Sequence, residues 1–162
     1  MKIKKMMILA QTLAIALVLA YVESIIPFNF SIPGMKVGLA NIAVVFALYR
    51  LGIAEAIAVS FLRMLVLFMM FGNGVSLLYS FAGAIVSLTL MFIFKKLNVF
   101  SIIGVSVIGA VGHNAGQIIA ACILLETTVV RYYFPALVIT GVITGIIIGI
   151  LAGVVTDRIK IS

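Results

Sequence analysis

Residues 133–156 read YFPALVITGVITGIIIGILAGVVT and contain no charged side chain. This stretch is long and apolar enough to cross the hydrocarbon core of a bilayer as an α-helix, which takes about 20 residues. The whole chain has the same character, since 65% of its 162 residues are hydrophobic, 9% are charged and its mean hydropathy is +1.42. A soluble domain is about half apolar and about one quarter charged. The sequence therefore predicts a protein that lies in a membrane.

Similar apolar stretches recur along the chain. They give six predicted spans, at residues 6–27, 37–51, 53–72, 75–94, 99–125 and 133–156. The connections between them are short, and no linker or low-complexity tract divides the chain, so residues 1–162 are predicted to form one domain. We therefore expect an all-α integral membrane bundle of six transmembrane helices.

The positions of the eleven Lys and Arg residues indicate the orientation of this bundle. Eight of them fall at ends that share one side of the membrane in a six-span chain: Lys2, Lys4, Lys5, Arg50, Lys95, Lys96, Arg158 and Lys160. Cytoplasmic connections are enriched in Lys and Arg, so both termini are predicted to be cytoplasmic. The expected location is a bacterial-type plasma membrane. The net charge of +7 then reflects orientation and gives little support to a nucleic-acid partner.

Polar residues inside the spans gather in the outer half of the predicted bundle. The candidates for a substrate site are Glu23, Lys36, Asn41, Arg63, Tyr79, His113, Asn114 and Gln117. Even on a lenient scale, an ionisable side chain at mid-depth in a bilayer costs about 2.5–3.5 kcal/mol. Each such residue therefore needs a partner, water or a function.

His113 and Gln117 are four residues apart and so share one helical face, which Gly109 extends. Two interpretations are open: a ligand pocket, or a helix-packing face whose polar groups are satisfied by neighbouring side chains. Three polar residues within five positions favour the pocket, because the rest of this span is apolar.

Arg63 lies near the middle of its span and cannot escape the cost of burial by losing its proton. It either pairs with a carboxylate, for which Glu23 is nearest in depth, or reaches an anionic ligand. The outward connection at residues 27–36 contains two prolines and a Pro-Gly turn signal. It is equally compatible with a lid over a pocket and with a loop in the headgroup layer.

Small residues mark two further helical faces. The last span carries Gly141, Gly145, Gly149 and Gly153, whose four-residue spacing favours packing inside the bundle over a homodimer seam or a channel-like oligomer. The first span carries two small-xxx-small pairs, Ala10 with Ala14 and Ala16 with Ala20. Such a surface suits docking against another helix, and from spacing alone we expect that helix to belong to the same chain.

The chain offers little to an enzyme mechanism. Asp157 is its single aspartate, so no paired acidic cluster can hold magnesium on a diphosphate. It has no Gly-rich Lys-Ser/Thr loop for a nucleotide, and with one His and one Cys it has no zinc site. We predict no catalytic residue, no metal and no cofactor in this chain.

The segment at residues 33–42, PGMKVGLANI, is preceded by Glu23 and followed by Arg63 and by GHNAGQ at residues 112–117. On these residues the chain resembles the heptaprenyl diphosphate synthase component I family, also called the Gx transporter family, along nearly its whole length. That family is similar to the S components of energy-coupling factor (ECF) importers. The resemblance implies the S-component fold, a six-helix bundle with both termini inside.

The resemblance also implies that several proteins carry out the transport together. An S component captures a vitamin-like compound from outside, while a membrane coupling protein and two cytoplasmic ATPases, which consume the ATP, drive its release inward. Ala10 and Ala14 match the surface that docks on the coupling protein, with Ala16 and Ala20 as a second register. The polar residues of the outer half would match the substrate site, and their surplus of basic groups indicates a ligand with an anionic portion. An isoprenoid or quinone precursor would fit, and so would a flavin or another vitamin.

The older family name implies a different role, as the non-catalytic membrane partner of a prenyl transferase in heptaprenyl diphosphate synthesis. The lack of paired aspartates indicates that this chain would assist such a reaction without performing it. The S component is our main hypothesis from the sequence, and the accessory synthase subunit is the alternative.

Overall fold

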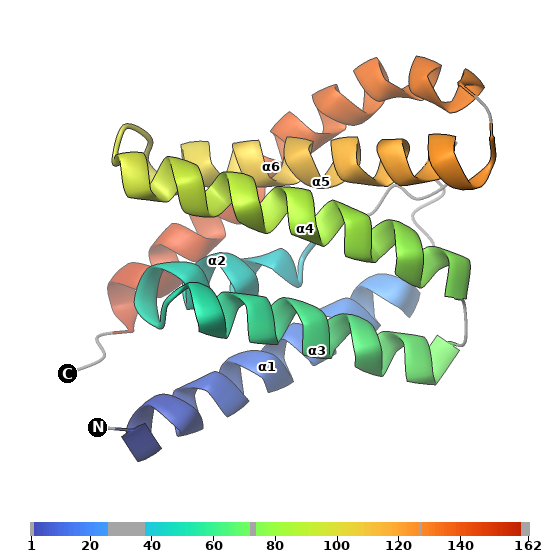
Figure 1. Cartoon of the computed structure of the whole chain (residues 1–162). Helices are drawn as coiled ribbons and strands as arrows, with labels where there is room; N and C mark the ends of the chain where they lie inside the picture. The colour runs from blue at the N-terminus through green and yellow to red at the C-terminus, as the bar shows by residue number, and fades with distance from the viewer. Residues whose placement is uncertain (1, 26–37, 72–73, 127, 160–162) are drawn as a thin grey trace.

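The computed structural model describes residues 2–25, 38–71, 74–126 and 128–159. Within them the chain is helical and contains no strand, as Figure 1 shows. The elements are α1 (Lys2–Ile25), α2 (Asn41–Arg50), α3 (Ile53–Phe71), α4 (Gly74–Leu97), α5 (Ile102–Leu124), the short 3-10 helix η1 (Val129–Tyr133) and α6 (Phe134–Arg158). The prediction of an all-α bundle is confirmed.

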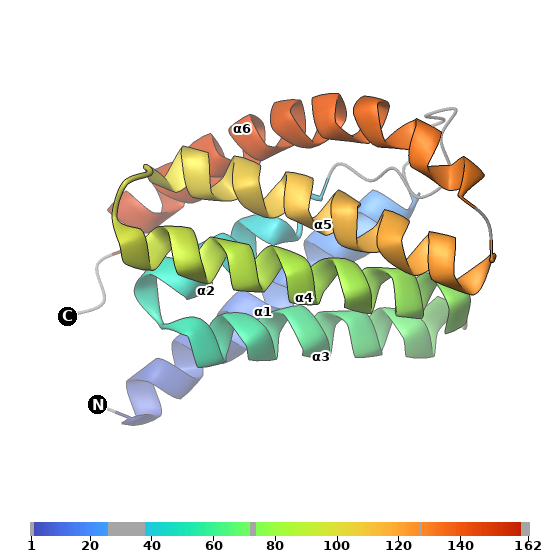
Figure 2. The same cartoon turned by 45° about the horizontal axis from the view of Figure 1, so that its top comes forward.

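Five of these helices, α1, α3, α4, α5 and α6, contain stretches long and apolar enough to cross a membrane. Their outward faces carry large hydrophobic side chains such as Ile15, Met69 and Ile143, which a bilayer can cover. The two chain ends lie at the same end of the bundle in both views (Figures 1 and 2). The chain is thus a multi-pass membrane protein.

The predicted second span, 37–51, contains a shorter helix than the other five spans. Its helix α2 has 10 residues and is therefore about 15 Å long, half of the roughly 30 Å core. Gly38 adopts a positive φ of 79°, and its carbonyl accepts the N–H of Asn41 at 2.8 Å in a tight turn, so the helix begins only at Asn41. Gly52, with a φ of 126°, follows its other end. Residue 37 lies outside the described residues.

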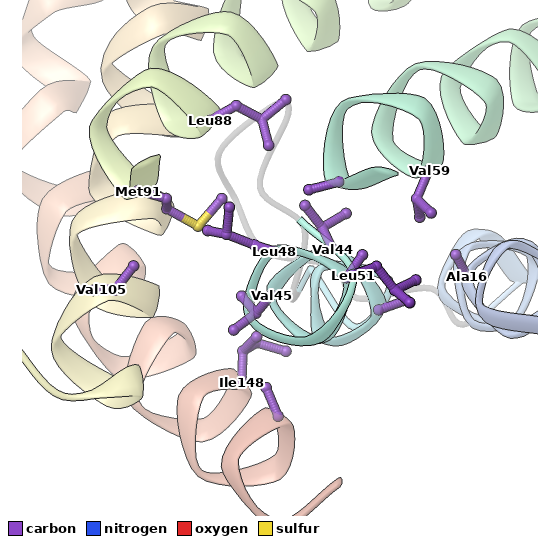
Figure 3. Close-up of a cluster of buried hydrophobic side chains, with 14 residues drawn as sticks. Ala16, Val44, Val45, Leu48, Leu51, Val59, Leu88, Met91, Val105 and Ile148 are labelled. Carbon is purple, nitrogen blue, oxygen red and sulfur yellow. The ribbon is translucent and has the colours of Figure 1, made fainter. Parts of the chain in front are cut away.

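The short helix α2 lies at the centre of the bundle. Six consecutive residues, Ala43 to Leu48, are buried. Figure 3 shows Val44, Val45 and Leu48 surrounded by side chains from the other five helices. These neighbours are Ala16 from α1, Val59 from α3, Leu88 and Met91 from α4, Val105 from α5 and Ile148 from α6. A helix that is apolar on all sides is expected in such a position.

Two cations bind backbone carbonyls near the C-terminal end of α2. Lys95 of α4 donates from Nζ to the carbonyl oxygen of Leu48 at 2.5 Å and lies 4.9 Å from the centre of the Tyr49 ring. Arg50 donates from Nε to the carbonyl oxygen of Thr156 in α6 at 2.9 Å. The carbonyls at helix ends have no partner within their own helix, so these contacts satisfy groups that lipid would leave without one.

The glycine face of α6 packs against α5. A Cβ atom added at Gly145 would lie 2.6 Å from the Cα of Val107, and one added at Gly149 would lie 2.6 Å from the Cα of Ile103. Only glycine allows backbones to come this close. Internal packing, the interpretation we preferred for this stripe, is confirmed for these positions. Around Gly153, by contrast, no atom lies within 4 Å of an added Cβ.

Candidate functional site

Three of the predicted site residues meet where α2 begins. Glu23 comes from α1, Asn41 from α2 and Arg63 from α3. The N–H of Gly38 donates to Glu23 Oε1 at 2.5 Å, and Arg63 Nη1 donates to Asn41 Oδ1 at 3.3 Å. We refer to Glu23, Gly38, Asn41 and Arg63 as the α2 cluster. It joins the first three helices by polar contacts inside an otherwise apolar assembly.

The α2 cluster differs in one respect from the Glu23–Arg63 ion pair that the sequence suggested. Glu23 is close enough to Arg63 to interact with it electrostatically, but its Oε1 is bound to the backbone of Gly38. Among the described residues, the ion pair that forms is Lys5 with Glu55, at 2.5 Å. Arg63 Nε is shielded from solvent and has no hydrogen-bond partner in this part of the chain. The guanidinium is thus only partly satisfied.

His113 of α5 lies against α4. A Cβ added at Gly83 would be 2.9 Å from His113 Nδ1, so the imidazole occupies the space beside that glycine. One turn earlier, a Cβ added at Gly109 would be 2.5 Å from Met91 Sδ. The face that the sequence marked by Gly109 and His113 therefore takes part in helix packing, and Gln117, half-buried, is on the same face.

Asn114 points to α6, whereas His113 lies against α4. Its Nδ2 donates to the carbonyl oxygen of Leu137 in α6 at 2.7 Å, and a Cβ added at Gly141 would lie 3.0 Å from the same nitrogen. Asn114 therefore links α5 to α6 while His113 packs on α4. Tyr79 of α4 is half-buried, and Lys36 lies outside the described residues.

Sequence reasoning missed the backbone partners of these side chains. The N–H of Gly38 and the carbonyl of Leu137 have no signature in the sequence, because every residue type other than proline offers the same groups. Gly83 was a usable signal, since a glycine in the middle of a membrane helix marks a point of close approach.

The alanines of α1 fall on two different faces. Ala16 and Ala20 are buried, with 0% and 7% of their surface exposed, whereas Ala10 and Ala14 are exposed. An open hollow of about 320 Å³ lies between α1 and α3 and is lined by Lys5, Met6, Leu9 and Glu55. The first alanine pair is thus available to another chain, while the second is used inside this one.

The comparisons with known proteins agree with the membrane bundle. The family model described as heptaprenyl diphosphate synthase component I matches residues 12–155, which run from α1 to the last turns of α6. Searches of curated proteins and of solved structures gave no match. The family description names one component of a synthase, in keeping with a chain that is not itself catalytic. Since the match covers most of the chain, this protein belongs to the heptaprenyl diphosphate synthase component I family.

Proposed function

We propose that this chain is a non-catalytic membrane subunit that assists heptaprenyl diphosphate synthesis in a bacterial-type plasma membrane, together with a separate prenyl transferase. The observation that carries the proposal is the family match over residues 12–155. The composition supports a divided task, because one aspartate in the whole chain cannot supply the acidic pairs that hold magnesium on a diphosphate. The catalytic residues must then belong to the partner.

The fold suits such a task. A long prenyl chain is apolar and partitions into lipid, while its diphosphate is charged and needs polar contacts. The described helices offer extended apolar faces toward the bilayer, and they hold the α2 cluster as a small polar region among them. A membrane subunit of this kind would keep a prenyl diphosphate near the transferase.

Purification from the native membrane tests this proposal. The tagged chain, extracted in a mild detergent, is expected to bring a prenyl transferase with it, and heptaprenyl diphosphate formation is expected to require both proteins. Recovery of no transferase, or equal activity of the transferase without this chain, would contradict the proposal.

A second candidate function is the substrate-binding S component of an ECF importer. It is favoured by the exposed Ala10 and Ala14 in the half of α1 predicted to be cytoplasmic, a small-residue pair that offers a surface for a partner helix. The partners would be a membrane coupling protein and two ATPases that consume ATP. Their recovery in the same purification would replace the first proposal with this one.

The exposed Ala10 and Ala14 also allow a more specific experiment, which applies to both proposed functions. Ala14→Leu adds volume to a face that is exposed in the isolated chain, so the variant is expected to keep its stability and to lose the copurifying partner. Thr89→Leu, at an exposed site on α4, is the matched control and is expected to retain the partner. Equal recovery of the partner with both variants would place the docking surface elsewhere.

A further inference from the structure

The contacts of Arg63 with the described residues satisfy its hydrogen-bond donors only in part. It lies near the middle of α3 (Ile53–Phe71), where a charged side chain is costly, and it is the one Lys or Arg that the sequence places deep inside a span. A guanidinium carries five N–H donors and cannot be neutralised by losing a proton. Its donors therefore need acceptors.

The described residues leave this requirement partly unmet. Arg63 Nη1 reaches Asn41 Oδ1 at 3.3 Å, beyond the usual limit of about 3.2 Å for an N–H···O bond. Arg63 Nε is shielded from solvent and has no acceptor among these residues. The arginine thus has donors to offer to a group from outside the chain.

The carboxylate of Glu23 does not directly supply the acceptor that Arg63 lacks. Glu23 acts on Arg63 through the electric field, while its Oε1 is held at 2.5 Å by the N–H of Gly38. The ion pair found among the described residues, Lys5 with Glu55, involves neither of them. An oxyanion placed on the guanidinium would supply the acceptor atoms that are missing there.

The surroundings indicate the side from which such an anion would come. Beyond Asn41, the next residues of α2 up to Leu48 are buried in the apolar core, and Lys95 holds the carbonyl of Leu48 at the cytoplasmic end. An anion therefore does not reach Arg63 from the side of the buried core around α2. Arg63 Nε is fully shielded, but the residue as a whole is only half-buried, so part of its side chain is still accessible.

We propose that Arg63 and Asn41 bind the head group of an isoprenoid diphosphate whose apolar chain lies along the surrounding helices. The guanidinium fork matches the oxygens of a phosphate group, and the amide of Asn41 can turn its nitrogen toward the same ligand. Asn41 also starts α2, whose positive dipole end favours an anion. The inference rests on the proposed function, because a prenyl diphosphate is the product named in the family description.

Thermal unfolding of the purified full-length chain in detergent, followed by circular dichroism, tests this site without any partner protein. Farnesyl diphosphate is the probe and farnesol the matched compound without a charge. The diphosphate is expected to raise the unfolding temperature of the wild type, as a ligand of the folded state does, and farnesol is expected to leave it unchanged. Because no transferase is present, failure here is distinct from failure to recover the transferase from membranes.

Two arginine variants locate the effect. Arg63→Gln is expected to weaken binding of farnesyl diphosphate by about tenfold or more, since a buried contact to a charged group is lost. Arg131→Gln, at an exposed arginine of η1, is the matched control and is expected to bind like the wild type. If Arg63→Gln loses helical content, Asn41→Ala is used in its place and is expected to weaken binding as well.

The unliganded variants separate a binding role from a structural one. If Arg63 serves a ligand, Arg63→Gln without farnesyl diphosphate unfolds at the same or a higher temperature than the wild type, because a costly buried charge has been removed. The proposal is overturned if farnesyl diphosphate does not stabilise the wild type, if farnesol stabilises it equally, or if the substitutions at Arg63 and Arg131 change binding to the same extent.

Discussion

Lys95 and Lys96 are neighbours in the sequence with different surroundings. Lys95 turns toward the centre of the bundle, where its Nζ binds the carbonyl of Leu48 and lies over the ring of Tyr49, whereas Lys96 is exposed. The positive-inside pattern predicts the side of the membrane for both residues but not this difference. The difference depends on where α2 ends, which becomes clear only once the helices are packed.

Lys95→Met is expected to destabilise the folded chain by about 1–3 kcal/mol, because the carbonyl of Leu48 is left in an apolar environment without its donor. Lys96→Met is the matched control and is expected to change the free energy of unfolding little. Circular dichroism at increasing temperature in detergent compares the two variants. Equal unfolding temperatures would show that the contact of Lys95 adds no stability.

The site residues were predictable to different degrees because their contacts also depend on how the helices pack. The spacing correctly placed His113 and Gln117 on one face of α5, and the depth argument brought Glu23 near Arg63. Which residues of a neighbouring helix contact a given helical face depends on the register between the two helices. The approach of Gly83 to His113 and the bond from Gly38 to Glu23 are fixed by that register and could not be deduced from one span alone.

At the scale of the elements, hydrophobic length predicted the long helices well and failed for α2. The expected span 53–72 became Ile53–Phe71, and 133–156 became Phe134–Arg158. An apolar run facing lipid and an apolar run buried in protein have the same composition, so α2 could not be recognised as a central half-length helix from the sequence. Its burial by the other five helices decides its role.

The glycine face of α6 gives a prediction with an internal control. Gly145→Ala would bring a Cβ to 2.6 Å from the Cα of Val107, so α5 and α6 have to move apart, at a cost of about 1–3 kcal/mol. Gly153→Ala meets no atom within 4 Å and is expected to be neutral or stabilising by up to about 1 kcal/mol, because alanine favours a helix. Thermal unfolding distinguishes the two, and similar losses in both variants would refute internal packing as the reason for the stripe.

At the scale of the whole molecule, the orientation of the bundle remains a prediction from charge. The two termini lie at one end, and the basic residues assign that end to the cytoplasm (Figure 1). Val99 and Val129 are exposed in connections that this orientation places on opposite sides of the membrane.

Cysteines at these two valines test the orientation. In a Cys122→Ala background, a thiol reagent that cannot cross membranes is expected to label Val129→Cys in intact cells, and to label Val99→Cys only after the membrane is opened. The reverse pattern would invert the bundle. It would also place the exposed alanines of α1 on the outer side, away from any cytoplasmic partner.

We propose that this membrane bundle contributes to prenyl diphosphate synthesis without performing the chemistry. This role is tested by the rate of heptaprenyl diphosphate formation by the partner transferase in liposomes with and without the purified chain. The rate is expected to depend on this chain, and the chain alone is expected to form no product. A transferase that works equally well without it would contradict the claim.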